Sequence, residues 1–290
     1  MADRAHWARV CRERTALAEP SDTGAILELG LLEDEAITLD SAALQIAALD
    51  HPGLDLTAYV DRLGAITERL VVLGGAAESA LSRAKILARV IGSEYGFTGD
   101  RESYDDPDNA DLIRVLDRRR GLPVSLTILY VAAARRLGWQ ADALNTPGHV
   151  VARIGSETEP VLIDPFDAGA VLDADRFSAL LRAVLGRGAA PRPEHLTPMS
   201  NRSVLVRLLM NQASRAEQVG QSERALTLFE RMTVIAPSNA HAWWERARLQ
   251  LYKGDVEAAR VSLSAMLEVT REPELRTHAC AALDALSRNR

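Results

Sequence analysis

The sequence predicts an α+β protein, in which a mostly helical domain with a small antiparallel sheet is followed by an all-α lobe of repeated helix pairs. Three observations support this prediction. Residues 124–134 form an almost continuous apolar run, residues 143–164 have the pattern of strands around a turn, and residues 199–290 repeat a pattern at an offset of 34. Helical and strand patterns therefore occupy separate segments, as expected for this fold class.

The apolar run predicts a central buried helix. Only Ser125 and Thr127 interrupt it, and a helix that is hydrophobic on all sides belongs inside a core. Pro123 suits the first helical position, and Gly138 suits the left-handed residue past the end. Ser125 therefore lies in the first turn, where free backbone N–H groups and the helix dipole favour an activated nucleophile or an oxyanion.

The segment after this helix predicts a β-hairpin. Residues 143–154 and 160–164 are expected to be strands, and the turn residues 155–158 form a loop of four between them. In the simplest register Ile154 faces Glu159. We therefore expect an antiparallel pair of strands packed against the buried helix.

This register predicts a candidate catalytic triad. Counting back from the turn places His149 opposite Asp164. Opposed residues on one face have Cβ atoms about 4.5–5.5 Å apart, which is close enough for a carboxylate to orient an imidazole. Ser125 would supply the nucleophile, His149 the base and Asp164 the group that orients the base.

These residues carry a resemblance to a known family. The chain contains YGFTGDRESYDDPDNADLIRVLDRRRGLPVSLTILYVAAARRLG, then TPGHVVAR and LIDPFDAG. Together they resemble the bacterial SirB-type family, whose core belongs to the transglutaminase-like superfamily and precedes tetratricopeptide repeats. The resemblance implies a papain-like fold, with Ser125, His149 and Asp164 at the positions of the superfamily's catalytic Cys, His and Asp.

Ser125 departs from the family pattern, which has cysteine at this position. A serine hydroxyl is a poorer nucleophile at neutral pH unless a base activates it. We therefore expect no active transglutaminase. Two functions stay open: a protein-interaction or regulatory scaffold with a remnant site, which we favour, and a serine-dependent acyl hydrolase (amidase, esterase or peptidase) with at most weak activity.

Apolar periodicity predicts helices on both sides of this core. They are expected at residues 4–18, 23–35, 42–49, 55–73, 76–94, 110–120 and 174–185. The expected division is an N-terminal extension (1–20), a transglutaminase-like domain (21–185), a linker rich in Gly and Pro (186–198) and a C-terminal lobe (199–290).

The C-terminal lobe contains an internal repeat. At an offset of 34, the matched pairs are Leu209 and Trp243, Ala213 and Ala247, Gly220 and Gly254, Ala225 and Ala259, Phe229 and Leu263, and Met232 and Met266. This is the period of tetratricopeptide repeats, with small residues where paired helices touch and Gly at the turn. Because two repeats bury too little core alone, we expect a terminal helix (274–287) and the first domain to cap them.

The repeats present a second candidate surface, opposite their packing face. It includes Met210, Asn211, Trp244, Arg248 and Tyr252. Concave repeat surfaces bind peptides or partner helices, so we expect a protein or peptide partner. Trp244 and Tyr252 are the expected anchors.

Composition and motifs exclude several other classes. With 34 basic and 40 acidic residues the net charge is −6, which argues against a nucleic-acid or anionic-membrane partner. Neither a signal peptide nor a membrane-spanning run is expected, and Cys11 and Cys280 do not suggest a disulfide framework, so we expect a cytoplasmic protein.

Cofactor and metal motifs are also missing from the sequence. It lacks Walker, GxGxxG and HExxH motifs, so we expect no cofactor and no metal site. The carboxylates of Asp105, Asp106, Asp108 and Asp111 do not follow calcium-loop spacing and are better explained as helix caps.

Overall fold

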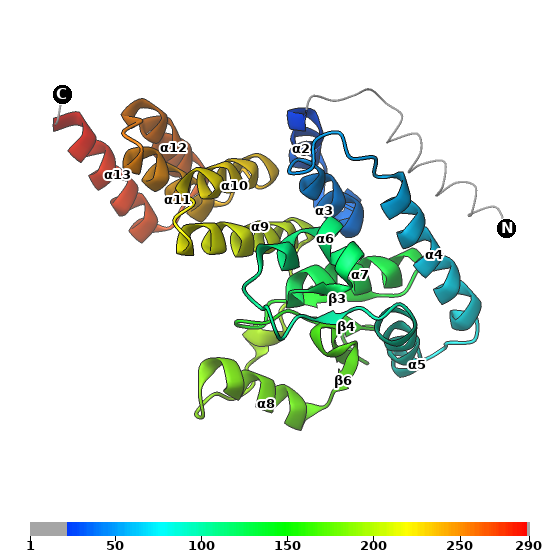
Figure 1. Ribbon diagram of the computed structural model, residues 1–290. Helices are drawn as coiled ribbons and strands as arrows, with labels where there is room; N and C mark the ends of the chain where they lie inside the picture. The colour runs from blue at the N-terminus through cyan, green and yellow to red at the C-terminus, as the bar shows by residue number, and fades with distance from the viewer. Residues whose placement is uncertain (1–21, 289–290) are drawn as a thin grey trace.

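The computed structural model describes residues 22–288, in which helices surround a small antiparallel sheet (Figure 1). The α-helices are α2 (Asp22–Leu31), α3 (Leu39–Ala48), α4 (Thr57–Gly74), α5 (Ala80–Leu87), α6 (Leu112–Arg118), α7 (Pro123–Arg136), α8 (Ala174–Leu185), α9 (Asn201–Gln218), α10 (Ser222–Ile235), α11 (Ala240–Tyr252), α12 (Val256–Val269) and α13 (Pro273–Arg288). Shorter helical turns are η1 (Asp34–Ala36), η2 (Ala88–Glu94, a π-helix), η3 (Pro107–Ala110), η4 (Pro165–Asp167) and η5 (Pro193–Leu196). The helix expected at 4–18, with Cys11, lies outside the described residues.

Helix α7 is the centre of the first domain, and the prediction of a buried helix here is confirmed. Every residue from Pro123 to Ala134 is buried. Pro123 occupies the start of the helix, and Gly138, just past its end, has a φ of 72°. The helix packs against α3 on one side and against strands β3 (Ala141–Leu144) and β4 (Val151–Ile154) on the other. Its all-round apolar character is therefore explained by contacts on all sides.

The sheet has the order β3-β4-β5-β6, with every neighbouring pair antiparallel. Strand β5 is Val161–Asp164 and β6 is Ala170–Leu172. The prediction of one strand over 143–154 is wrong, because β3 and β4 are two strands that pair with each other. Gly148, with a φ of 64° in the connection between them, lets the chain reverse after Pro147.

The predicted register of the next hairpin is wrong by two residues. Ile154 pairs with Val161 rather than with Glu159. Pro160 has no N–H to donate to a ladder, so pairing begins one residue later and the loop is longer than four residues. A shift of two keeps each side chain on the same face, because the side-chain period of a strand is two.

A second, two-stranded parallel sheet brings the start of α7 beside an earlier segment. Strands β1 (Thr98–Gly99) and β2 (Arg120–Gly121) pair in register. The loop that follows β1 then ends in η3, whose last residues lie against the start of α7 and against α9. This arrangement delivers the backbone of Asn109 to the first turn of α7.

The C-terminal helices form consecutive packed pairs, and α11 to α13 project away from the rest of the molecule (Figure 1). Most matched apolar positions of the internal repeat are buried alike, with Ala213, Ala225 and Met232 at 0% exposure and their partners at 0–1%, whereas Trp243, the partner of the buried Leu209, is only partly buried. Gly220 and Gly254 both have a positive φ, at the turns between paired helices. Equivalent residues therefore do equivalent packing in the two pairs.

The expectation that this lobe docks on the first domain is confirmed for α9 and α10. Their apolar side chains belong to the same core cluster as those of α2, α3 and α7, whereas α12 and α13 lie in a second cluster, and α11 contributes to both. Asp34 accepts hydrogen bonds from the first backbone N–H groups of α9, at 2.8 Å each. Asp50 pairs with Arg224 and Arg231 of α10.

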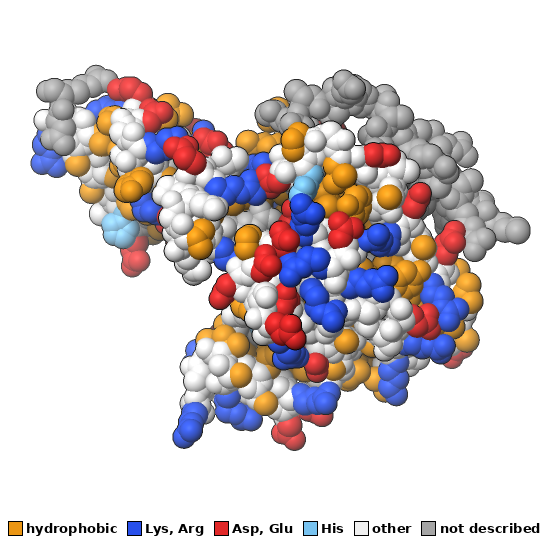
Figure 2. Space-filling model, viewed as in Figure 1, with side chains coloured by type: hydrophobic (Ala, Val, Ile, Leu, Met, Phe, Trp, Pro, Cys, Tyr) orange, Lys and Arg blue, Asp and Glu red, His pale blue; other side chains and the backbone are white. Residues whose placement is uncertain are grey.

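Within residues 22–288, none of the helices combines the length and the apolar character that crossing a membrane requires. On the face seen in Figure 2, Lys and Arg side chains gather near the middle, with Asp and Glu among and around them. Ion pairs of the described chain include Arg62 with Asp117 and Arg118 with Asp100.

Candidate functional site

His149 and Asp164 form a hydrogen-bonded pair on one side of the sheet. The Nε2 of His149 lies 2.8 Å from the Oδ1 of Asp164. Both side chains are largely buried, with exposures of 11% and 8%. The predicted contact between these residues is therefore present, although the register that led to it is displaced by two.

Asp164 is held in place by the turn that follows β5. Its Oδ1 also accepts a hydrogen bond of 2.9 Å from the backbone N–H of Phe166 and so caps η4. The left-handed Ala168 and Gly169 then turn the chain into β6. The carboxylate is thus fixed by backbone geometry as well as by the imidazole.

His149 lies just before β4, where its backbone is anchored twice. Its N–H donates to Thr146 O, and its carbonyl accepts from Arg207 of α9 at 3.2 Å. Its ring meets that of Phe166 edge to face, with centroids 5.8 Å apart. The imidazole orientation is therefore set by Phe166 and Asp164 together.

Ser125 is buried at 0% exposure, and its hydroxyl faces backbone carbonyls. Its Oγ lies 2.8 Å from Asn109 O and 3.0 Å from Leu122 O, both as donor. Among residues 22–288, His149 makes no hydrogen bond with it. The structure therefore joins two of the three triad positions and directs the third hydroxyl elsewhere.

Two aromatic residues near this pair were not singled out by the sequence. Tyr130, one of the apolar run, is fully buried, and within the described chain its hydroxyl has no hydrogen-bond partner. Burial is the main cause that raises the pKa of Tyr130 far above its ordinary value, and the negative charge of Asp164 adds to it. It therefore stays neutral beside the carboxylate. Tyr104, in the loop after β1, meets Phe166 edge to face at 5.8 Å.

Sequence reasoning could not distinguish these aromatics from ordinary core and loop residues. Tyr130 lies in α7, where the residues on either side of it are also buried, so the sequence there suggests only a packing role. Tyr104 is 39% exposed and lies beneath the guanidinium of Arg215, which is 5.5 Å from its ring centroid. Only the tertiary fold shows that Tyr130 lies near Asp164 and that Tyr104 contacts Phe166, whose ring also meets His149.

Two of the four acidic loop residues, Asp106 and Asp111, act as caps as predicted, whereas Asp105 pairs with Arg215 and Asp108 with Arg118. The Oδ1 of Asp106 accepts from the N–H of Asp108, and the Oδ1 of Asp111 accepts from two N–H groups at the start of α6. In the part of the chain that the structure describes, no cluster of three or more His, Cys, Asp or Glu side chains is arranged to hold a metal ion.

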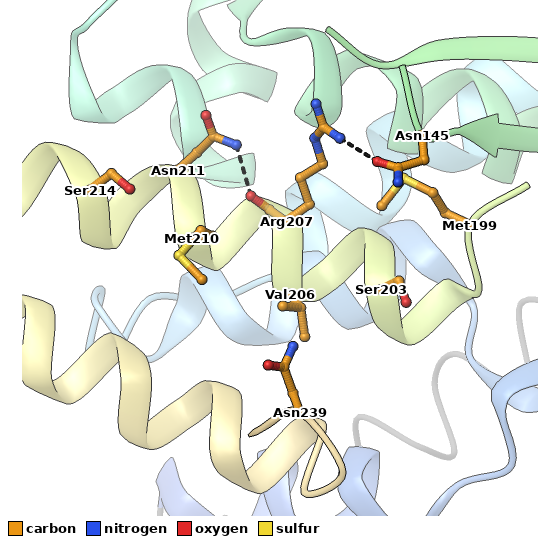
Figure 3. Close-up of a pocket in the computed structure, with 9 residues that line it drawn as sticks. All are labelled: Asn145, Met199, Ser203, Val206, Arg207, Met210, Asn211, Ser214 and Asn239. Carbon is orange, nitrogen blue, oxygen red and sulfur yellow. Dashed lines mark hydrogen bonds between the residues drawn. The ribbon is translucent and has the colours of Figure 1, made fainter. Parts of the chain in front are cut away.

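A pocket of about 420 Å³ lies along α9, and two of the predicted partner-binding residues line it (Figure 3). These are Met210 and Asn211. The pocket is lined by Asn145, Met199, Ser203, Val206, Arg207, Met210, Asn211, Ser214 and Asn239. The first domain, α9 and the turn before α11 therefore all contribute to it.

The other predicted partner-binding residues lie on α11, beyond this pocket. Tyr252 is 79% exposed. Trp244 lies against His278 of α13, with ring centroids 6.3 Å apart. Arg248 pairs with Glu217 of α9 and with Glu245. The five residues therefore lie on α9 and α11, but only two of them line the pocket.

Comparison with known proteins identifies the family. Residues 56–210 match the model of a transglutaminase-like superfamily domain. A UPF0162 protein of Xylella fastidiosa is 31% identical over 247 residues, covering 83% of this chain and 87% of the relative. Protein SirB1 of Salmonella typhimurium is 30% identical over 181 residues, covering 62% and 65%.

Another relative matches a shorter part of the chain. F-box only protein 21 of Mus musculus is 35% identical over 78 residues, which is 27% of this chain and 12% of that protein. No solved structure matches the chain. The match to the domain model spans more than half of the sequence, and the Xylella relative aligns with most of it. The chain therefore belongs to the transglutaminase-like superfamily and is a member of its SirB1-like UPF0162 group.

Proposed function

We propose that this protein is a scaffold that binds other proteins and that its transglutaminase-like site is a remnant without acyl-transfer activity. The observation that carries the proposal is the orientation of the Ser125 hydroxyl. It is buried, and it hydrogen-bonds to the carbonyl oxygens of Asn109 and Leu122 rather than to His149. Ser125 is therefore a structural residue that ties η3 to the first turn of α7.

Serine hydrolysis requires a different geometry. The nucleophile must pass its proton to the base while it attacks, so the hydroxyl must point at the imidazole and reach a bound carbonyl group. A hydroxyl has a single hydrogen, and here a carbonyl oxygen accepts it. Turning the Ser125 hydroxyl toward His149 would break that hydrogen bond inside the core. Because Ser125 is fully buried, a substrate would still have no route to it.

We further propose a domain division to accompany this role. Residues 21–185 form a transglutaminase-like domain of papain-like type, residues 186–198 a linker, and residues 199–290 two tetratricopeptide repeats with α13 as a cap. The 34-residue offset, the matched burial of its positions and the paired helices support the repeat assignment. The papain-like assignment rests on a central helix followed by a sheet that bears His149 and Asp164.

The partner that we propose is a protein or peptide that binds along the α9–α11 side. Met210, Asn211, Trp244, Arg248 and Tyr252 supply apolar, amide and cationic contacts there. The exposed aromatic ring of Tyr252 is the kind of side chain that anchors partners. The net charge of −6 favours neither nucleic acid nor an anionic membrane as partner, and we place the protein in the cytoplasm.

The proposal is tested by active-site labelling of the full-length protein. A fluorophosphonate probe and acyl-ester substrates are expected to give no labelling and no hydrolysis above the level of the Ser125→Ala variant. The same variant should retain partner binding in full. Labelling that maps to Ser125 and disappears in both Ser125→Ala and His149→Ala would overturn the remnant-site assignment.

The second candidate function is serine-dependent acyl hydrolysis, and the intact His149–Asp164 pair is the observation that favours it. In this candidate His149 would act as base and Asp164 would orient it. The two functions make opposite predictions for His149→Ala. A hydrolase loses all turnover in this variant, whereas a scaffold changes only in stability.

A further inference from the structure

The pocket along α9 has an unusual balance of charge. Of its nine described lining residues, five are neutral polar, three are apolar and one, Arg207, is a cation; none is acidic. In Figure 3, Arg207 and Asn211 rise on one side of α9, and Val206 and Met210 point to the other side, toward Asn239. The pocket therefore has a cationic edge and an apolar edge.

Arg207 is bound only by neutral acceptors. Its Nη1 donates to the Oδ1 of Asn145 at 2.7 Å, and its Nη2 donates to the carbonyl oxygens of Thr146 and His149 at 3.0 and 3.2 Å. A guanidinium has five N–H donors, so two remain for another acceptor. The Nδ2 of Asn145 donates to none of the described residues, so its N–H groups are also free beside those of Arg207.

Half-buried arginines of the described chain are satisfied in two ways: some pair with carboxylates, whereas others, such as Arg202 and Arg276, bind backbone carbonyls. Arg153 pairs with Asp142 at 2.7 Å and Arg231 with Asp50 at 2.7 Å. Among residues 22–288, Arg207 has no ion pair with Asp or Glu, and burial lowers its pKa from the ordinary value. A half-buried cation without a counter-charge is costly, and an anion that binds it removes part of that cost.

From this arrangement we propose that the pocket holds an acidic peptide, whose carboxylate group binds the free N–H groups of Arg207 and Asn145. One carboxylate oxygen can accept a charge-assisted hydrogen bond from a guanidinium N–H, and the other oxygen can accept from the amide of Asn145. Met199, Val206 and Met210 receive an apolar side chain of the same peptide, and methionine adapts to several shapes. The inference rests on the proposed binding function and adds the chemistry of the ligand.

The test uses the full-length protein and fluorescein-labelled random-sequence peptides in matched sets. One set carries a fixed Glu and a free C-terminus, the second replaces Glu by Gln, and the third replaces Glu by Gln and is amidated. Fluorescence anisotropy is expected to show binding of the first set at least about tenfold tighter than the third, because charge-assisted hydrogen bonds are lost. The preference should weaken as salt is raised.

Variants then locate the carboxylate site. Arg207→Met is expected to remove the preference for the acidic set, and Arg182→Met, which removes an exposed arginine of α8, is expected to leave it unchanged. Arg207→Lys keeps the charge without the planar fork and should retain part of the preference. Because Arg207 also binds the backbone of two residues, thermal unfolding is measured for each variant to check that it folds. The comparison of the peptide sets on the native protein does not depend on the variants.

The outcomes separate this inference from the proposed function. Equal binding of all three sets would overturn the carboxylate site and leave the scaffold role standing. Binding by none of them would overturn both. A carboxylate preference that survives in Arg207→Met would place the anion elsewhere and also contradict the inference.

Discussion

Replacing Ser125 by cysteine introduces the residue type that the family resemblance predicts for a nucleophile and tests the proposed structural role of this position. The introduced Sγ should take the place of Oγ, at 0% exposure and facing the carbonyl oxygens of Asn109 and Leu122. Burial and the partial negative charge of carbonyl oxygens both disfavour a thiolate. We therefore expect the pKa of the introduced thiol to lie above that of an ordinary cysteine.

The expected reaction rate follows from this burial. Alkylation of a buried thiol requires local opening of the structure, and an opening free energy of about 3 kcal/mol lowers the rate roughly 100-fold. The exposed Cys280 is the internal reference. At neutral pH the introduced thiol should therefore react with iodoacetamide at least about 100-fold more slowly than Cys280.

The assay is a short pulse of iodoacetamide followed by peptide mass spectrometry, which quantifies each cysteine separately. Unfolding the protein in urea should make the two rates similar, which controls for the intrinsic reactivity of the thiols. Combining Ser125→Cys with His149→Ala should change nothing, because the thiol has no contact with the imidazole. Alkylation faster than that of Cys280, and slowed by His149→Ala, would refute the reasoning and restore a working dyad.

Three further predictions concern stability. Gly121→Ala should lower the free energy of unfolding by about 1–3 kcal/mol, because the added Cβ would lie 2.7 Å from the Ser125 Oγ. In a urea-unfolding double-mutant cycle the loss should shrink when Ser125→Ala is present, and simple additivity would contradict this contact. Burial raises the pKa of Asp50, but hydrogen bonds and charges from Arg231 and Arg224 outweigh it, so the net pKa is lowered. The ionised form of Asp50 therefore stabilises the protein above the unfolded-state pKa, and this stabilisation is lost as pH falls through the folded-state pKa. In urea titrations, the free energy of unfolding of Asp50→Asn should fall less steeply with acid than that of the wild type. The isolated fragment 199–290 should melt without a sharp transition by circular dichroism, since the core of α9 and α10 is shared with the first domain; a cooperative melt of a monomer would contradict this.

Helix α7 could be predicted from the sequence because its signals are local and agree with one another. An apolar run, Pro at the start and Gly past the end mark the same boundaries, and burial on all sides follows from the run itself. Helix α8 was likewise predicted with its cap, since the side chain of Asp173 accepts from the N–H of Arg176. Such features depend on neighbours within a few residues and need no knowledge of the tertiary fold.

The strands were harder, because a turn and a proline changed their limits. The sequence pattern joined β3 and β4 into a single strand and missed β6, which has only three residues. The contact between His149 and Asp164 was nevertheless predicted correctly. The register error was an even number of residues, so both side chains stayed on the expected face.

The orientation of Ser125 could not be predicted from the sequence. Its acceptors are backbone carbonyls, and one of them belongs to Asn109, which η3 and the β1–β2 pair bring to the start of α7. Carbonyl oxygens occur at every residue and leave no mark in a sequence pattern. A triad inferred from residue types and spacing therefore fixes which residues are neighbours, but not where a hydroxyl points.

The intact His149–Asp164 pair is compatible with the proposed remnant site, because each residue also supports the fold. The Asp164 carboxylate caps η4 through the N–H of Phe166, and the imidazole fills the space beside the ring of Phe166. The carbonyl of His149 binds Arg207, which lines the pocket on α9. The pair thus connects the sheet to the helices that carry the proposed peptide site. Its geometry would be retained by these packing and hydrogen-bonding roles even without a nucleophile, so the presence of the pair does not by itself indicate an enzyme.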